Sequence, residues 1–280
     1  MNKRIISLLL VIVMALSLVA CGAPAAEAPA ATEAPKADAP AAEAPAAEAP
    51  AEKELITVGF AQVGHESDWR MANTKNYQEV FSVENGYDLV FVDCDNDNAV
   101  QIEAVRTSIQ QDVDYIVLAP IQSAGWEAVL QEAKDAGIPV IVADRQVDAP
   151  AEMYDAFLGT DTHVEGVAAG NWLAEYLNGE PAKILEIYGT IGASAAIGRA
   201  EGFREIAADH PEWEIIDSQS GDFTQTGGQE VMESFIKSYD DFNVVYCHND
   251  NEAYGAMDAM DAAGITYGVD GDVIIISFDA

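Results

Sequence analysis

Short apolar runs alternate with amphipathic stretches from Ile56 to the end of the chain. The runs are nearly continuous and rich in Val and Ile, which is typical of strands buried on both faces of a parallel sheet. They begin at Ile56, Tyr87, Tyr115, Pro139, Ala182, Glu214, Asn243 and Asp272. We therefore expect each run to form a strand of an α/β protein.

Amphipathic helices are predicted between these strands. Residues 99–111, for example, place Ile102, Val105 and Ile109 on one helical face. Similar patterns cover residues 124–137 and 228–238. Strands and helices follow one another at roughly 25 to 30 residues per unit, the spacing of right-handed βαβ units in an open parallel sheet.

The number of these units predicts two lobes, because lobes of roughly 100 residues fit the size range of single cores better than one large sheet does. We expect two lobes, each a parallel sheet flanked by helices. The first lobe is assigned to residues 55–158 and the second to residues 159–280. The chain is expected to cross between them near Phe157–Asp161.

The first 54 residues are not expected to belong to this fold. Lys3 and Arg4 precede an apolar run of about fifteen residues, which suits a signal peptide in residues 1–20 better than a membrane span. The run ends in LVACG, which resembles the site where bacterial lipoproteins are lipidated on Cys, here Cys21. A plain signal peptide cut elsewhere is the alternative. Residues 21–54 repeat Ala, Pro and Glu, which favours an extended linker.

The formal charge of −35 limits the possible partners. The chain lacks the clustered Lys and Arg that nucleic acid requires, and anionic lipid would repel it, so any membrane attachment must come from something other than surface charge. The histidines lack metal-ligand spacing, and the run from Asp93 lacks the Gly and closing Glu of a calcium loop, so no metal or cofactor is expected. Cys94 and Cys247 could pair, but we expect buried free thiols because we place them in different lobes.

The chemistry is expected just after the strands, because ligands of open α/β sheets bind beyond the carboxyl ends of the strands. Planar Arg, Asp and Asn groups there can hold adjacent sugar hydroxyls, and an aromatic ring can pack on the C–H face of a sugar. The predicted substrate-binding residues are Glu66, Trp69, Arg70, Asp144, Arg145, Ser194, Arg199, Asp222, Phe223, Asn249 and Asp279.

Structural alternatives stay open for several of these side chains. Asp144 and Arg145 could form an ion pair that only closes a strand end. Trp69 could be the first core residue of its helix, and Arg199 could lie on a helix surface. Each alternative predicts a side chain that does not face a shared cleft.

Helix capping is a further alternative for the segment His248–Asn251. Asn249 could be a helix N-cap, and Asp250 is expected to be mostly a cap, because Asn and Asp are favoured at that position. Trp126 and Trp172 lie on predicted helix faces, and we expect both to serve packing.

Several motifs together carry a family resemblance. The stretch from Ile56 to Ala280 contains VGHESDWR, the pair DR at 144–145, GTIGASAAIGRAEGF, SQSGDFTQTGGQEVMESFIK and HNDNEAYGAM. In this combination it is similar to the periplasmic sugar-binding proteins of the ribose type, and most similar to their galactofuranose-binding branch. The resemblance implies two Rossmann-like lobes hinged around a central cleft, joined by three hinge strands, which close on a monosaccharide.

The resemblance also implies roles for individual residues. Asp144 and Arg145 match the first-lobe pair that grips ring hydroxyls, and Trp69 and Arg70 match first-loop contacts. The matching second-lobe contacts are Arg199, Phe223, Asn249 and Asp279, whereas the weaker candidates are Glu66, Ser194 and Asp222.

The function implied by the resemblance is that of a binding protein and not an enzyme. It is the monomeric lipoprotein of an ABC importer, on the outer face of the cytoplasmic membrane, which delivers the sugar to the permease. A sensor that presents the sugar to a receptor kinase is the alternative. Family members continue past the position of Asp279 with further βα units, so we expect this sequence to be a truncated record or a fragment.

Overall fold

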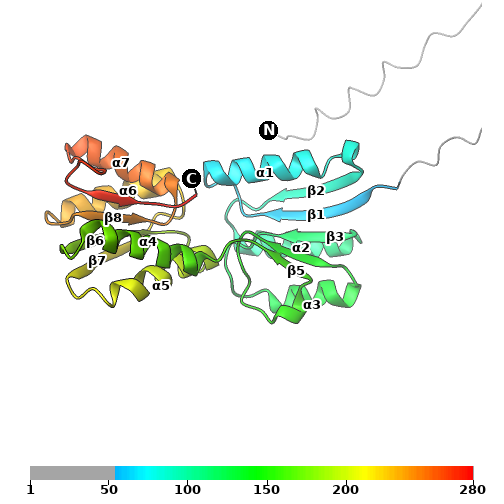
Figure 1. Ribbon diagram of the computed structural model, residues 1–280. Coiled ribbons are helices and arrows are strands. Elements are labelled where there is room, and N and C mark those ends of the chain that lie inside the picture. The colour runs from blue at the N-terminus through cyan, green and yellow to red at the C-terminus, as the bar shows by residue number, and fades with distance from the viewer. Residues whose placement is uncertain (1–53, 280) are drawn as a thin grey trace, which may run out of the picture. The chain divides into compact units, whose positions relative to one another are not determined.

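The computed structural model describes residues 54–279, which belong to one compact unit of the chain (Figure 1). The predicted signal peptide, the lipidation site at Cys21 and nearly all of the predicted linker lie outside the described residues. No helix within residues 54–279 is both long and apolar enough to span a bilayer.

A five-stranded parallel sheet organises residues 56–158, which we call the first half. Its strands lie in the order β2-β1-β3-β4-β5. The strands are β1 (Ile56–Gln62), β2 (Tyr87–Asp93), β3 (Tyr115–Leu118), β4 (Val140–Ala143) and β5 (Ala156–Leu158). The helices are α1 (Asp68–Val80), α2 (Asn98–Gln110) and α3 (Glu127–Ala136), with short 3-10 helices at Val83–Asn85 and Ala151–Met153.

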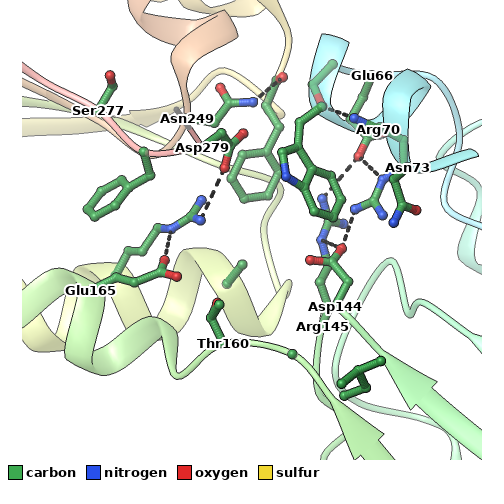
Figure 2. A pocket seen from close by; sticks show the side chains of 18 of the residues that line it. Glu66, Arg70, Asn73, Asp144, Arg145, Thr160, Glu165, Asn249, Ser277 and Asp279 are labelled. Carbon is green, nitrogen blue, oxygen red and sulfur yellow. Dashed lines mark hydrogen bonds and ion pairs between the residues drawn. The ribbon is translucent and has the colours of Figure 1, made fainter. Parts of the chain in front are cut away.

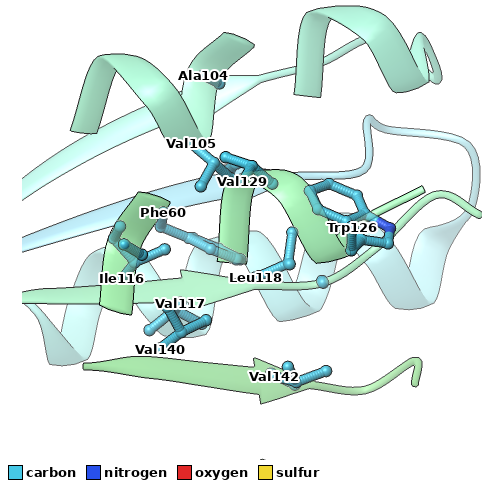
Figure 3. Close-up of a cluster of buried hydrophobic side chains, with 14 of the residues drawn as sticks. Phe60, Ala104, Val105, Ile116, Val117, Leu118, Trp126, Val129, Val140 and Val142 are labelled. Carbon is cyan, nitrogen blue, oxygen red and sulfur yellow. The ribbon is translucent and has the colours of Figure 1, made fainter. Parts of the chain in front are cut away.

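The alternation along β1 shows how the helices cover this sheet. Phe60 points to one face, where its ring lies 4.3 Å from that of Tyr77 in α1. Gly59 points to the other face, where a Cβ atom would lie 2.5 Å from Ser108 Oγ of α2, so the glycine lets that helix approach closely. One continuous cluster of buried side chains results, and part of it is drawn in Figure 3.

A four-stranded parallel sheet, in the order β7-β6-β8-β9, organises residues 159–279, which we call the second half. Its strands are β6 (Ala182–Tyr188), β7 (Trp213–Ser220), β8 (Val244–Cys247) and β9 (Ile274–Ile276). Its helices are α4 (Thr162–Leu177), α5 (Ser194–Ala207), α6 (Gln225–Ser238) and α7 (Asp250–Ala263). The buried side chains of this half form three smaller clusters.

Glycine also brings α6 and α7 into close contact. A Cβ atom on Gly228 would lie 2.4 Å from the carbonyl oxygen of Glu252, and one on Gly255 would lie 2.0 Å from that of Gln225. The two helices can therefore pack backbone against backbone, which buries the first turn of α7 beneath α6. The first turn of α7 borders the candidate site.

The predicted α/β fold with parallel, helix-flanked sheets is confirmed, and a strand lies within every predicted apolar run. Cys94 and Cys247 are free and buried, as expected. Trp126 is buried as predicted, but the packing role predicted for Trp172 is wrong, because its ring is exposed and stacks on Tyr176. Trp172 instead borders a groove on the surface between α4 and the segment Ile275–Phe278.

Candidate functional site

A polar cleft of about 710 Å³ lies at the carboxyl ends of the strands of both sheets (Figure 2). Each strand contributes through the loop or helix that follows it, except β2 and β3. The residues that line it include Glu66, Trp69, Arg70, Asn73, Tyr77, Asp144, Arg145, Thr160, Glu165, Arg199, Phe223, Asn249, Ser277, Phe278 and Asp279. Most of the side chains predicted from the sequence thus meet in one space.

Four charged residues of the first half form a connected network in this cleft. Arg70 donates from Nε to Glu66 Oε1 at 3.0 Å and from Nη2 to Asp144 Oδ2 at 2.6 Å. Arg145 donates from Nη2 to the same Glu66 oxygen at 3.2 Å. The side chains of Glu66 and Arg70 are only 1% and 2% exposed, so the network is held in a largely dehydrated environment.

Local structure explains why these four side chains converge. Ser67 caps α1 by accepting a hydrogen bond from the backbone N–H of Arg70, which turns the chain so that Glu66 and Arg70 face each other. Asp144 takes a left-handed backbone conformation with φ of 64° directly after β4, which directs its carboxylate toward Arg70. Burial and the neighbouring Arg70 lower the pKa of Arg145 to about 10, which leaves its guanidinium charged at neutral pH.

Arg199 is the corresponding cation of the second half. Its Nε donates to Glu165 Oε2 at 2.8 Å, its Nη2 lies 3.3 Å from Asp279 Oδ1, and its Nη1 donates to the backbone carbonyl of His248. Burial raises the pKa of Asp279 to about 6, although the charge of Arg199 acts in the opposite direction. The alternative of a surface position for Arg199 is therefore wrong, because the residue is buried at the cleft.

Two aromatic side chains line the cleft in different ways. Trp69 is 37% exposed, and the Arg70 guanidinium lies 4.9 Å from its ring centroid, so it is not the core residue that one alternative proposed. Phe223 is buried, and the guanidinium of Arg145 lies over its ring at 4.8 Å. Trp69 thus offers an open aromatic face, whereas Phe223 joins the two halves through Arg145.

The side chain of Asn249 serves as a helix cap. Its Oδ1 accepts the backbone N–H of Glu252 at 2.9 Å, and its Nδ2 donates to the carbonyl of Phe223 at 3.0 Å. Asn249 lines the cleft, but both ends of its amide already have protein partners. The expected capping role of Asp250 is wrong, because Asn249 occupies the cap and Asp250 begins α7.

Two predicted substrate-binding residues do not lie in the cleft. Ser194 begins α5, and its Oγ accepts the backbone N–H of Gln146 at 2.7 Å, which joins the two halves beside the cleft. Asp222 has a left-handed backbone, which turns its carboxylate away to accept a hydrogen bond from Ser220 Oγ at 3.1 Å. Both residues follow strands, but the turn geometry directs their side chains elsewhere.

Other lining residues were missed by the sequence analysis. Asn73 and Tyr77 follow Arg70 at helical spacing, so the periodicity of α1 was a signal that could have identified them. Glu165 lies in the first turn of α4, just after the short strand β5, whose end was treated only as the crossing between lobes.

Three polar atoms in the first-half network have no hydrogen-bond partner within residues 54–279. They are Glu66 Oε2, Arg70 Nη1 and Arg145 Nη1. Buried charged atoms without partners are costly, so a molecule in the cleft that both donates and accepts hydrogen bonds, water included, would stabilise the arrangement. In the same described range, no three His, Cys, Asp or Glu side chains come close enough together to hold a metal ion.

Two parallel α/β halves whose strand ends enclose a polar cleft define a two-lobed binding protein for a small polar molecule. Comparison with known proteins agrees with this class. The chain belongs to the periplasmic binding protein domain family, which matches residues 58–280. The resemblance predicted from the motifs is thereby confirmed.

Individual relatives are similar over most of the described residues. The chain is 44% identical over 219 residues to the galactofuranose-binding protein YtfQ of Escherichia coli, covering 77% of this chain and 69% of that protein. It is 32% identical over 194 residues to the ribose import binding protein RbsB of Bacillus subtilis, covering 69% of this chain and 60% of that protein. The chain therefore spans roughly two thirds of the length of these relatives.

A solved structure shows the same fold at comparable identity. It is the periplasmic binding protein component of the arabinose ABC transporter from Shewanella sp. ANA-3, bound to α- and β-L-arabinofuranose. The two structures have a TM-score of 0.75 at 40% identity, covering 80% of this chain and 74% of that chain.

Proposed function

We propose that this protein is the extracytoplasmic receptor of an ABC importer, which captures one monosaccharide in the cleft and delivers it to the permease. The sugar belongs to the furanose-forming pentoses and hexoses, galactofuranose foremost. The observation that carries the proposal is the set of three partnerless polar atoms on Glu66, Arg70 and Arg145, whose side chains are buried at the cleft.

The charge balance of the cleft favours a neutral ligand. Three guanidinium groups, on Arg70, Arg145 and Arg199, face four carboxylates, on Glu66, Asp144, Glu165 and Asp279. The charges nearly cancel, so a strongly charged ligand would remain largely uncompensated beside these buried groups. A neutral polyol fits, because each hydroxyl both donates and accepts and can satisfy Glu66 Oε2 together with a guanidinium N–H.

The open face of Trp69 supports a sugar in particular. A furanose or pyranose has a C–H face that packs on an aromatic ring, and the exposed indole at the cleft offers such a surface. The relatives named above carry galactofuranose, ribose and arabinose in their names, and they supply the sugar class of this proposal.

Capture is proposed to work by closure of the two halves. Charged groups from both halves line the same cleft, so a bound sugar would gain more contacts when the halves approach each other. A ligand shifts such an equilibrium only through its preference for one state, which contacts from both sides provide. Nothing in this process breaks a covalent bond, so the sugar should be recovered unchanged.

A monosaccharide screen tests the proposal directly. Thermal unfolding is measured for the full chain with D-galactose, L-arabinose, D-ribose and D-fructose, and calorimetry follows for any sugar that raises the unfolding temperature. A sugar present at a hundred times its Kd adds about 2.7 kcal/mol to the stability of the folded state, which raises the unfolding temperature by several degrees. A complete lack of response to this panel would contradict the proposal.

The membrane partners are also part of the proposal. Lipidation at Cys21 would hold the protein at the outer face of the cytoplasmic membrane, and that residue lies outside the described part of the chain. Genes for a permease and an ATPase beside this one would support the importer, whereas a receptor kinase in their place would favour a sensor with the same cleft.

A further inference from the structure

Two successive residues at the edge of the cleft have a left-handed backbone. Asp222 has φ of 54° and Phe223 has φ of 61°, directly after β7. Asp tolerates this conformation, but for a bulky aromatic residue it is an outlier that persists only where surrounding contacts enforce it. The structure must therefore contain groups that hold the backbone of Phe223 in place.

Those groups come from the first turn of α7. The backbone N–H of Phe223 donates to Glu252 Oε1 at 2.9 Å, and the carbonyl of Phe223 accepts from Asn249 Nδ2 at 3.0 Å. Both polar groups of the Phe223 backbone are thus bound to side chains of a neighbouring element. Asn249 and Glu252 are in turn joined to each other, because the N–H of Glu252 donates to Asn249 Oδ1.

Glu252 connects two loops as well as holding Phe223. Its second oxygen, Oε2, accepts the backbone N–H of His248 at 3.1 Å, so one carboxylate joins the loop after β7 to the loop after β8. Its side chain is buried and does not line the cleft. Burial raises the pKa of Glu252 to about 8, although the hydrogen bonds from Phe223 and His248 oppose that effect.

The position of the Phe223 ring has a direct consequence for the cleft. The ring lies over Gly189, where a Cβ atom would approach it to 2.2 Å, and this leaves the ring no room to move toward the sheet. The Arg145 guanidinium of the other half lies over the same ring at 4.8 Å. A displaced ring would take away one of the surfaces that orient Arg145.

We propose that Glu252 is a positioning residue for ligand binding: it holds Phe223 in its left-handed conformation, and the ring of Phe223 orients Arg145 across the cleft. This inference rests on the proposed function, because Arg145 matters here only as a ligand contact. It assigns a role to a residue that touches no ligand space itself.

The variant Glu252→Gln tests the inference. Its amide has nearly the shape of the carboxylate but is uncharged and has only one accepting oxygen, so the hydrogen bond that it accepts from the Phe223 N–H is weakened or lost. The N–H of His248 also donates to the carbonyl of Ile187 at 3.0 Å and keeps that partner. Hydrogen exchange of the Phe223 amide, measured by NMR without ligand, should accelerate at least tenfold. Affinity for L-arabinose and D-galactose, measured by calorimetry, should fall about tenfold for whichever of the two the wild type binds.

A double-variant comparison separates positioning from a general structural effect. If Glu252 acts through Phe223, then adding Glu252→Gln to Phe223→Ala should lower the affinity by less than a further twofold. If Glu252→Gln fails to fold, it is combined with Asp222→Gly, because glycine takes the left-handed conformation without strain. Hydrogen exchange and sugar affinity are then measured on the double variant.

Met260→Ala provides the matched control. Met260 is a fully buried residue of the same helix, in a core cluster away from the cleft, so its loss destabilises α7 without touching the hydrogen bonds to Phe223. The sugar affinity of Met260→Ala should stay within about twofold of that of the wild type. Hydrogen exchange of its Phe223 amide should be no faster than the loss of global stability of this variant predicts.

The outcomes are distinguishable. The inference is overturned if Phe223 exchanges in Glu252→Gln as it does in Met260→Ala, or if the tenfold loss of affinity persists in the Phe223→Ala background. A further outcome is that exchange at Phe223 accelerates as expected while neither sugar binds even the wild type. In that case Glu252 does position the backbone of Phe223, and the proposed function is wrong.

Discussion

The two halves of the molecule hold their cleft cations in different ways. In the first half, Arg145 is 5% exposed and pairs with Glu66, whose side chain is 1% exposed and is shared with a second guanidinium. In the second half, Arg199 pairs with Glu165 and Asp279, which are 25% and 18% exposed, and it also donates to a backbone carbonyl. The first half thus has one fully buried carboxylate, Glu66, shared by two guanidinium groups beside the 25% exposed Asp144, whereas both carboxylates of the second half are partly exposed.

This difference determines how far the effect of a substitution should extend from the substituted residue. Removal of one member of a buried ion pair leaves the other charge dehydrated and without a partner, which is far more costly than loss of a pair that water can replace. In the first half, a change at one residue should therefore disturb the whole network. In the second half, water can take over a lost contact, and the effect should stay local.

The largest effect is expected for Arg145→Ala. The change removes one of the two cations that contact Glu66, together with the guanidinium that lies over Phe223. Removal of one partner of a buried ion pair lowers the free energy of unfolding by about 3 to 5 kcal/mol. We expect sugar binding to be undetectable by calorimetry, with an unfolding temperature clearly below that of the wild type.

Arg199→Ala is the matched change in the second half. It should also abolish sugar binding, because Arg199 lines the same cleft, but its partners remain partly hydrated, so the loss of stability should be much smaller. If the unfolding temperature fell equally in the two variants, the two halves would not differ in how they hold their cations. Unchanged affinity in either variant would contradict the assignment of the site.

A smaller effect is expected for Glu186→Gln. Glu186 is a buried carboxylate of the second half that does not line the cleft. Burial alone would raise the pKa of Glu186, but hydrogen bonds from His248 and Arg204 lower it to about 2, below the ordinary value of 4.5. Because the folded pKa is lower, the carboxylate stabilises the fold above pH 4.5, and this contribution disappears as the pH falls toward 2. The difference corresponds to roughly 3 kcal/mol at neutral pH.

Chemical denaturation at several pH values measures this effect. The free energy of unfolding of Glu186→Gln should lie below that of the wild type at pH 7, and the gap should narrow between pH 4.5 and 2. Glu233→Gln serves as the control, because Glu233 is exposed and its pair with Lys237 should contribute little. A gap that stays constant with pH would show that Glu186 acts through shape and not charge.

Much of the fold was predictable from the sequence, because buried parallel strands require continuous apolar runs and ligand contacts follow strand ends. That rule placed Arg70, Asp144, Arg145 and Arg199 in one cleft. The same rule did not identify Glu165, because β5 is only three residues long and is partly exposed, unlike a buried strand.

Side-chain direction was harder to predict than position along the chain. Asp222 follows a strand as Asp144 does, and both have a left-handed backbone, yet only Asp144 faces the cleft. Glu252 resembles an ordinary exposed acidic residue in the first turn of a helix, and its burial depends on the contact of α7 with Gly228 of α6. Such contacts depend on tertiary packing, which no local pattern encodes.

The smallest effect is expected where the halves touch each other without involving the cleft charges. Asn251, at the start of α7, accepts the backbone N–H of Asp68 through Oδ1 at 3.1 Å, and its Nδ2 lies 3.4 Å from Asp68 Oδ2. This contact joins α7 to α1 across the two halves and lies outside the cleft lining. It should therefore favour the closed arrangement whether or not a sugar is bound.

Asn251→Ala should consequently weaken binding of every sugar by the same factor of about two to five, the equivalent of one net hydrogen bond. Calorimetry with the tightest and the weakest sugar of the panel measures that factor. Asp68→Asn, which keeps the backbone N–H and a side-chain acceptor, should change both affinities less. If Asn251→Ala weakened one sugar and not the other, Asn251 would belong to the recognition site, and the second half would hold its ligand by more than Arg199 and its neighbours.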